Sequence, residues 1–199
     1  MNIFQILICD DDWLEWNIHN QQHVLAEKKQ KMLDVFCDYD YHLYTNDKAK
    51  EFLSEFDKEV FDCFNTLNPY AFRADLLRYC LLYKFGGWYF DLSIKVVQKF
   101  TCDHDYIIFQ NPKVACIENC ILYSSPSTSF YSKLIQKIVS NVKDRLYGRD
   151  CLNITGPSMM KDVFNKHDKQ DKKNNFLYGK LLKNDETGEF SINNNLFAI

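Results

Sequence analysis

The chain has 199 residues, of which 46% are hydrophobic and 26% are charged, and its formal net charge at pH 7 is -3. This length and composition are typical of one globular domain over residues 1–199 and exclude a disordered or fibrous protein. Because this charge supplies no positive field for a polyphosphate backbone, a general nucleic-acid binder is also excluded.

Cysteines and apolar runs indicate the compartment. The eight cysteines contain no CxxC pair and are too sparse for a disulfide-stapled scaffold, so we expect buried free thiols. The first residues carry no basic leader, and no stretch reaches the roughly 20 apolar residues that cross a bilayer. We therefore predict a cytoplasmic protein with no transmembrane segment. The abrupt end of the sequence, SINNNLFAI, leaves open a missing C-terminal segment.

The first part of the chain predicts alternating strands and helices. Residues 3–9 form a short apolar run before three aspartates, which is typical of a buried strand that ends in a loop. A helix is expected over about residues 18–33, and a second strand over residues 41–45. Asn46 is then the predicted cap of a helix over residues 47–56, which has an apolar stripe. This order indicates an α/β layer structure.

A helix that is apolar nearly all round is predicted over residues 69–85. Asn68 suits its N-cap and Gly86 the position just past its end. Asp75 and Arg78 are three positions apart, so they share one face of this helix. Charges on an enclosed helix are costly unless they are paired or bound. The spacing alone leaves both a buried ion pair and a ligand site open.

The segment WYFDLSIKV, residues 88–96, predicts a strand directly after the glycine pair. Alternation places four apolar side chains on one face and Tyr89, Asp91, Ser93 and Lys95 on the other. Asp91 then lies near the end of a buried strand, where the ligands of α/β sheets bind. Asp91 and Ser93 together suit a hard divalent cation or sugar hydroxyls, although a bare Asp-x-Ser triplet is more often an ordinary strand end.

The α/β pattern continues in the later part of the chain. Residues 105–111 and 119–125 predict two short strands, and residues 130–142 show a helical period. Residues 155–157, Thr-Gly-Pro, mark a turn that begins another helix. The highly charged residues 165–175 are interpreted as a solvated loop.

Taken together, ADLLRYCLLYKFGGWYFDLS resembles the central signature of glycosyltransferase family 32, whose sugar-binding region carries a DXD motif. Weaker similarity in IFQILI, YHLYTND and NITGP extends the resemblance over roughly residues 3–165. The family is similar in fold to yeast mannosyltransferases and to the glucosylating domains of clostridial toxins. The resemblance implies a GT-A fold, in which helices flank a Rossmann-like nucleotide-binding sheet in a single domain.

The resemblance also implies an activity. Members transfer a hexose, usually with retention, from a UDP- or GDP-linked sugar to an acceptor hydroxyl in glycan or polysaccharide synthesis. A divalent cation, Mn²⁺ or Mg²⁺, usually assists. The expected partners are therefore a nucleotide-sugar donor and a glycan, lipid-linked or protein acceptor.

Site residues carry over by position. Asp75 and Arg78 match the helix pair that contacts the donor sugar, and Asp91 matches the first motif aspartate, which binds ribose, sugar and metal and is the predicted catalytic residue. Ser93 replaces the second aspartate, so it is expected to be a neutral metal ligand. Leu7 stands where many members have Trp near the nucleotide, and Asn46 where others have Asp.

Three alternatives remain open. Loss of the second carboxylate at Ser93 predicts, as one alternative, a nucleotide-sugar-binding protein with reduced or no catalysis. In a second, Lys95 supplies positive charge on the same strand face and the site needs no metal. A metal-dependent hydrolase built on residues 10–12 with a histidine is the weakest, because the histidines lack HExxH spacing and His19 and His23 fit a solvated helix face.

Overall fold

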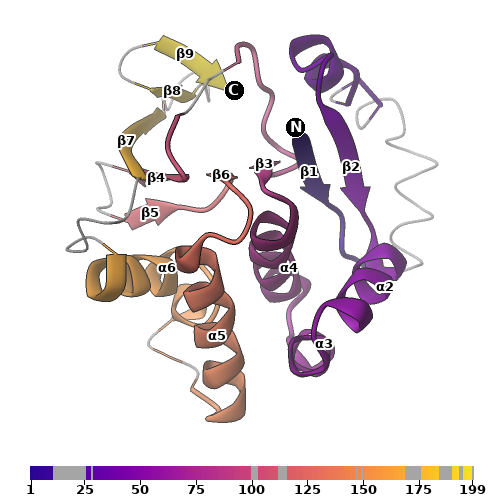
Figure 1. Cartoon of the computed structure of the whole chain (residues 1–199), viewed down its shortest axis with the longest axis vertical. Coiled ribbons are helices and arrows are strands. Elements are labelled where there is room, and N and C mark those ends of the chain that lie inside the picture. The colour runs from indigo at the N-terminus through magenta and orange to yellow at the C-terminus, as the bar shows by residue number, and fades with distance from the viewer. Residues whose placement is uncertain are drawn as a thin grey trace.

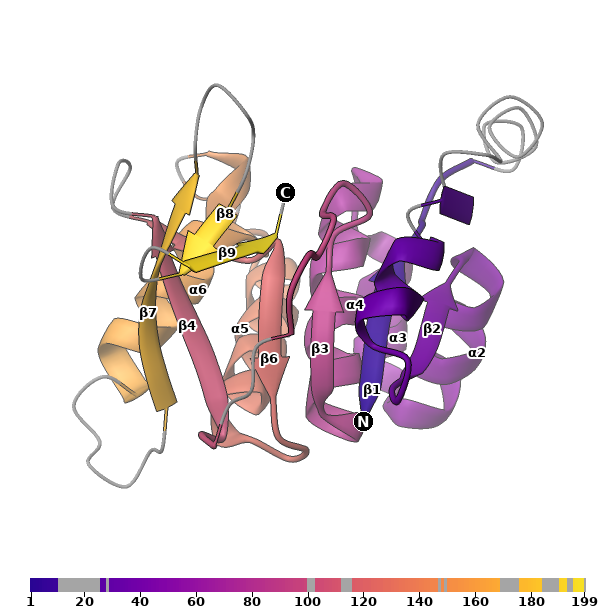
Figure 2. The same ribbon diagram turned by 90° about the horizontal axis from the view of Figure 1, so that it is seen from above.

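A mixed β-sheet forms the centre of the computed structural model (Figures 1 and 2). The structure describes residues 1–10, 26–27, 29–99, 103–111, 116–146, 148, 150–168, 176–183, 190–192 and 195–198. Within these ranges the strand order is β2-β1-β3-β6-β4-β7-β8-β9, and β5 pairs with β4. The strands are β1 (Asn2–Ile6), β2 (Asp40–Tyr44), β3 (Gly87–Phe90), β4 (Tyr106–Asn111), β5 (Cys116–Glu118), β6 (Ile121–Ser124), β7 (Phe176–Lys183), β8 (Phe190–Ile192) and β9 (Asn195–Ala198).

Helices cover the sheet. In the view of Figure 2 they lie mostly behind it. The helices on this side are α2 (Asn46–Phe56), α3 (Lys58–Thr66), α4 (Tyr70–Phe85), α5 (Ser129–Lys143) and α6 (Pro157–Val163), with a 3-10 turn at Cys151–Asn153 and a π-helical turn at Phe164–Asp168. Residues 29–35 are also helical and lie against the opposite face, where Met32 and Phe36 pack on Trp88 and Phe90. The fold is therefore a three-layer α/β arrangement.

The direction of the strands changes along the sheet. β1 pairs in parallel with both β2 and β3, whereas β3 and β6 are antiparallel. From β1 the chain passes first to β2 on one side and later, through α4, to β3 on the other. Such a reversal of strand order opens a crevice outside the carboxyl ends of the strands, which is where α/β sheets bind ligands.

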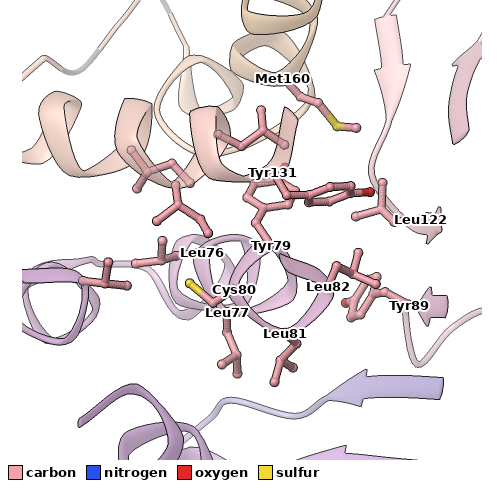
Figure 3. Packing of buried hydrophobic residues seen from close by; sticks show 14 of the residues in the cluster. Leu76, Leu77, Tyr79, Cys80, Leu81, Leu82, Tyr89, Leu122, Tyr131 and Met160 are labelled. Carbon is pink, nitrogen blue, oxygen red and sulfur yellow. The ribbon is translucent and has the colours of Figure 1, made fainter. Parts of the chain in front are cut away.

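Two apolar cores follow from the alternation of side chains along the strands. Phe4 and Tyr89 face the larger core under α2 to α6, whereas Ile3, Trp88 and Phe90 face the smaller core on the other side. In Figure 3, Tyr79 of α4 lies against Tyr131 of α5, with ring centroids 6.1 Å apart, while other side chains point to the opposite side of α4. This packing explains why α4 is apolar nearly all round.

Most predicted elements are confirmed, with shifted ends. The first two strands, the helix over 47–56, the strands over 105–111 and 119–125 and the helices at 130–142 and after Pro157 are all present. The helix expected over 18–33 lies partly outside the described residues; its described part runs to residue 35. The prediction of a loop over 165–175 is wrong for residues 165–168, because Phe164–Asp168 forms a π-helical turn. Residues 169–175 lie outside the described residues.

Two predicted helix caps are wrong by one position. Thr45 rather than Asn46 is the N-cap of α2, and Pro69 rather than Asn68 is the N-cap of α4. Gly86 is the residue just past the end of α4, as predicted, with φ 63°. None of the helices described is both long and apolar enough to span a membrane.

Candidate functional site

The site begins on α4, where Asp75 and Arg78 are both buried. Helical spacing puts them on one face, and Arg78 Nη2 lies 3.2 Å from Asp75 Oδ1. The side chain of Arg78 is 7% exposed and that of Asp75 is 12% exposed. A charge at this depth destabilises a fold unless it has partners. Of the two alternatives left open by the spacing, the ion pair is therefore present, and the ligand site stays a prediction.

Arg78 makes a second ion pair, with Asp91 at the end of β3. Its Nη1 lies 3.2 Å from Asp91 Oδ1, and the same nitrogen donates a hydrogen bond of 2.7 Å to the carbonyl oxygen of Asn119. The guanidinium also lies over the Tyr89 ring, 4.5 Å from its centroid. Burial disfavours the charged guanidinium, yet Tyr89, Asp91 and Asp75 raise the pKa of Arg78 above its ordinary value. Arg78 therefore stays a cation between two carboxylates.

Asp75, Arg78 and Asp91 form a charged cluster, of which Asp91 is the accessible member. Its backbone N–H donates to the Cys120 carbonyl at 2.8 Å, and the Tyr89 hydroxyl donates to Asp91 Oδ1 at 2.5 Å. Its side chain is 34% exposed. Since both polar contacts of the carboxylate use Oδ1, the other oxygen, Oδ2, has no partner among the described residues. Asp91 thus combines a fixed orientation with one oxygen available to a ligand.

Asp75 is held by donors from two distant loops. Thr155 Oγ1 donates to Asp75 Oδ2 at 2.7 Å, and Asn119 Nδ2 donates to Asp75 Oδ1 at 3.0 Å. Burial raises the pKa of Asp75 above its ordinary value, and Arg78, Thr155 and Asn119 work against that rise. Each donor stabilises the carboxylate form.

The cluster lies at the carboxyl ends of the parallel strands β1 and β3, at the crevice where the strand order reverses. Gln5 of β1 ties the two strands together here. Its Nε2 lies 3.5 Å from the Asp91 carbonyl oxygen, and its Oε1 accepts a hydrogen bond of 2.9 Å from the Tyr41 hydroxyl. The topology and the side chains therefore indicate the same place for a ligand.

The prediction that Ser93 and Lys95 continue the strand face of Asp91 is wrong. β3 ends at Phe90, and the Ile94 N–H donates to the Asp91 carbonyl at 2.9 Å, which closes a turn. Ser93 is exposed in this turn. Regular alternation therefore no longer places Lys95 beside Asp91.

Leu7 follows β1, and Asn46 is the first residue of α2. The Leu7 N–H donates to the Tyr44 carbonyl at 2.8 Å, which extends the pairing of β1 with β2. The Asn46 amide donates to the Cys9 carbonyl, so it fixes the segment that follows β1. These hydrogen bonds go to the backbone of β2 and of the segment after β1, and not to Asp75, Arg78 or Asp91. The structure brings these three charged residues together and leaves the two predicted nucleotide residues at a neighbouring position along the same sheet edge.

Asp91 Oδ2 is a candidate protein ligand for a divalent cation, and Ser93, which the sequence predicted as a second ligand, lies in the exposed turn that follows. No group of three or more His, Cys, Asp or Glu side chains that could hold a metal occurs among the described residues. Mg²⁺ commonly takes one or two carboxylates and completes its shell with substrate phosphates and water. The residues present fit an ion bound in that open manner and do not form a closed protein site.

Two other regions are separate from this cluster. A cavity of about 780 Å³ is lined by residues of α3 and α5, including Glu59 and Lys143, and by none of the predicted site residues. The hydrolase alternative rested on residues 10–12 and on His19 and His23, which, apart from Asp10, lie outside the described residues. Asp10 accepts a hydrogen bond from the Tyr70 hydroxyl.

Four residues that form hydrogen bonds with Asp75 or Asp91 were absent from the predicted site: Gln5, Tyr89, Asn119 and Thr155. A sequence signal existed for two of them. Tyr89 shares a strand face with Asp91, and Thr155 lies in the Thr-Gly-Pro turn. Gln5 is a polar residue within an apolar run, and Asn119, predicted as the first residue of the strand over 119–125, lies in the loop between β5 and β6. Neither could be assigned to Asp75 or Asp91 before the strands were paired.

Comparisons with known proteins bear on the family and the fold of the chain. Residues 20–114 match the family described as the glycosyltransferase sugar-binding region containing DXD motif. The chain is 26% identical over 146 residues to inositol phosphoceramide mannosyltransferase 2 of Schizosaccharomyces pombe, a match that covers 71% of this chain and 42% of that protein. It is 30% identical over 113 residues to mannosyl phosphorylinositol ceramide synthase of Saccharomyces cerevisiae, covering 56% of this chain and 30% of that protein.

The chain therefore spans less than half the length of these two relatives. Among solved structures, PaToxG glycosyltransferase superposes with a TM-score of 0.59 at 18% identity, covering 84% of this chain and 69% of that one. This similarity shows a shared fold, of the GT-A type that the resemblance implied. The resemblance itself is confirmed by the family match.

Proposed function

Because residues 20–114 match the DXD glycosyltransferases, we propose that this chain moves a hexose from a nucleotide-diphosphate sugar, UDP- or GDP-linked, to an acceptor hydroxyl. Transfer with retention, in the synthesis of a glycan or polysaccharide, is part of the proposal. The acceptor is a glycan, a lipid-linked group or a protein. Two relatives are named mannosyltransferases, so a nucleotide-linked mannose is the first donor to test.

One observation carries the proposal: Arg78 joins Asp75 and Asp91 at the carboxyl ends of β1 and β3. The matched family region contains all three residues, and the fold places them where ligands of α/β sheets bind. An ion pair that served only to stabilise the fold would have no need of the crevice or of an accessible carboxylate. The desolvation cost of a buried ion pair can exceed the attraction between its charges, so burial of the pair is weak evidence that it serves to stabilise the fold.

The chain's own residues have separate tasks in the proposed reaction. The bond between the sugar and the diphosphate breaks, and negative charge develops on the departing phosphate oxygen. Asp91 Oδ2 accepts a hydrogen bond from a donor hydroxyl or holds an ion, while Tyr89 and Arg78 keep the carboxylate in place. Arg78 and Asp75 orient the sugar through their small exposed surfaces.

A divalent cation is part of the proposal because the cluster of Asp75, Arg78 and Asp91 has no net positive charge. One guanidinium and two carboxylates carry a net negative charge, which repels a diphosphate. A bound Mn²⁺ or Mg²⁺ would supply positive charge to the leaving group. Asp91 Oδ2 would hold it directly or through water, with Ser93 as a neutral ligand.

Replacement of Asp91 by Asn tests the proposal. D91N keeps the size of the side chain but removes the charge, so turnover of the donor should fall by at least about 100-fold, the scale seen when one transition-state contact is lost. The measurement is release of nucleotide diphosphate with a series of UDP- and GDP-hexoses. Asp144→Asn, an exposed change at the end of α5, is the matched control and should keep wild-type turnover. Equal turnover in D91N and wild type contradicts the assignment.

The alternative is a nucleotide-sugar-binding protein with reduced or no catalysis. The observation that favours it is the position of Ser93, a neutral side chain on an exposed turn where the family has a second carboxylate. The same assay separates the two functions. Donor binding without release of nucleotide diphosphate, even with acceptors present, supports the alternative.

A further inference from the structure

Thr155 reaches the cluster from a distant part of the chain. It is fully buried, and its hydroxyl donates to Asp75 Oδ2 at 2.7 Å across a separation of 80 residues. Asp75 Oδ1 is shared by Arg78 and Asn119. Among the described residues, Thr155 is the hydrogen-bond donor to the second oxygen. The hydrogen bond to Asp75 Oδ2 therefore depends on the Thr155 hydroxyl.

The position of that hydroxyl is itself fixed by two helices. The Tyr79 hydroxyl of α4 donates to the Thr155 carbonyl at 3.2 Å, and Asn141 Nδ2 of α5 donates to the Ile154 carbonyl at 2.9 Å. The next residue, Gly156, is the N-cap of α6, and a Cβ added there would lie 3.5 Å from Asp75 Oδ2. The backbone thus approaches the carboxylate closely and is held there from both sides.

We propose that Thr155 is a positioning residue for sugar transfer, which holds the Asp75 carboxylate in the orientation that Arg78 and the donor require. The inference rests on the proposed function and extends it to a residue outside the matched segment 20–114. A carboxylate with an unpaired oxygen in a buried place pays the full desolvation cost of that group. Loss of the hydroxyl therefore favours the protonated or a rotated form of Asp75.

The charged and titratable groups that face Asp75 are Arg78 and Tyr79 on α4 and Tyr89 and Asp91 at the end of β3. Arg78 favours the ionised form of Asp75, and Asp91 disfavours it. Burial already raises the pKa of Asp75, so removal of the Thr155 donor raises it further. A variant without the hydroxyl should then need a higher pH to reach full activity.

Two substitutions at one position separate the hydroxyl from the space that it fills. Thr155→Val keeps the shape and removes the hydroxyl, whereas Thr155→Ser keeps the hydroxyl. In T155V, kcat should fall about tenfold and the acidic limb of the pH profile should move up by about one pH unit, because each unit corresponds to tenfold in the equilibrium between the two forms. The kcat of T155S should stay within about threefold of the wild-type value, because the hydrogen bond to Asp75 is kept.

Thr128→Val is the matched control. The Thr128 hydroxyl is bonded to Ser124 and Ser125, away from Asp75, so its loss should leave the pH profile unmoved. A purely structural role for Thr155 predicts a loss of rate that is equal at every pH. That result, or a T155V enzyme with wild-type kinetics, would overturn the inference.

A second measurement needs no turnover. The loss of unfolding free energy in T155V should be small at low pH, where Asp75 is protonated, and should grow as pH rises through the folded pKa of Asp75. In an Asp75→Asn background this pH dependence should disappear. If the wild type turns over no donor, the proposed function is wrong. Urea denaturation of the wild type, T155V, D75N and the double variant still decides whether Thr155 acts through Asp75. A pH-independent effect of T155V shows that it does not.

Discussion

Arg78 balances two carboxylates that could not be buried together without it. Asp75 and Asp91 each lie 3.2 Å from a different nitrogen of the guanidinium, whose planar geometry lets one side chain face two partners. Removal of water from three charges is expensive, and additional donors from Thr155, Asn119 and Tyr89 reduce that expense. The cluster therefore depends on the whole set of contacts more than on any one pair.

Replacement of Arg78 by Met should destabilise the protein strongly at neutral pH. The variant keeps apolar bulk but leaves two carboxylates without their cation, and breaking a buried pair in this way costs about 3–5 kcal/mol. The loss should shrink at acidic pH, because burial raises the pKa of Asp75 and the protonated Asp75 no longer needs a cation. Urea denaturation at two pH values measures both effects.

Lys143→Met provides the comparison for R78M. Lys143 pairs with Glu59 on the surface, and both side chains are more than half exposed. Exposed pairs contribute about 0–1 kcal/mol. A loss in R78M no larger than that in K143M would show that Arg78 is not needed by its carboxylates.

The residue pattern alone predicted part of this site. Three-residue spacing on an apolar helix was enough to place Asp75 beside Arg78, and a carboxylate after an apolar strand was enough to place Asp91 at the sheet edge. The pattern could not give the partners Asn119 and Thr155, because their contacts span 44 and 80 residues and arise only when the strands pair. Ser93 was misplaced because a turn looks like a continuing strand when its residues happen to alternate.

At the scale of elements, Gly86 and Gly87 form the turn between the end of α4 and the start of β3. Both glycines have positive φ, 63° and 110°. A Cβ at Gly87 would lie 2.3 Å from the Asn2 carbonyl oxygen, closer than real Cβ contacts come. Glycine here therefore allows β1 and β3 to approach, and Asp91 follows directly from that pairing.

Gly87→Ala should reduce both stability and donor turnover. Positive φ in a residue with a Cβ costs about 1–3 kcal/mol, and the clash with Asn2 adds to it, so the unfolding free energy should fall by more than about 2 kcal/mol. Urea denaturation and the nucleotide-release assay measure the two effects. Gly179→Ala is the control, since an added Cβ there meets, among the described residues, the Phe109 ring at 3.3 Å and no backbone atom. Equal losses in both variants would contradict this explanation.

Element prediction succeeded where local patterns were strong. The apolar stripe of α2 and the apolar runs of β1, β4 and β6 gave their positions within a few residues. The strands β5, β7, β8 and β9 were not predicted. β5 has three residues, and β7 pairs with β4 across about 70 residues, so their place depends on contacts that no short window of sequence contains.

At the scale of the molecule, one sheet connects the described elements from β2 to β9. The proposed donor site lies near β1 and β3, where the direction of chain progression reverses. We propose that the chain folds as a single domain around this sheet. A ligand that binds only the folded form then stabilises the whole unit.

Donor binding should therefore raise the melting temperature. At 100 times its dissociation constant a donor adds about 2.7 kcal/mol, which corresponds to roughly 5–10 °C for a chain of this size. With Mn²⁺ the shift should exceed that in EDTA, and D91N should lose the manganese-dependent part. An equal shift and full activity in EDTA would instead support a metal-free site. Flat melting curves across UDP- and GDP-sugars contradict donor binding altogether.

The contacts that hold Asp75, Arg78 and the Oδ1 oxygen of Asp91 all come from the chain itself. Water around a free carboxylate has to turn when charge develops nearby, whereas groups locked by folding need little reorganisation. The ordering of these dipoles is thus achieved once, when the protein folds, and does not recur in each catalytic cycle. The proposed donor would therefore meet side chains that the fold has already oriented.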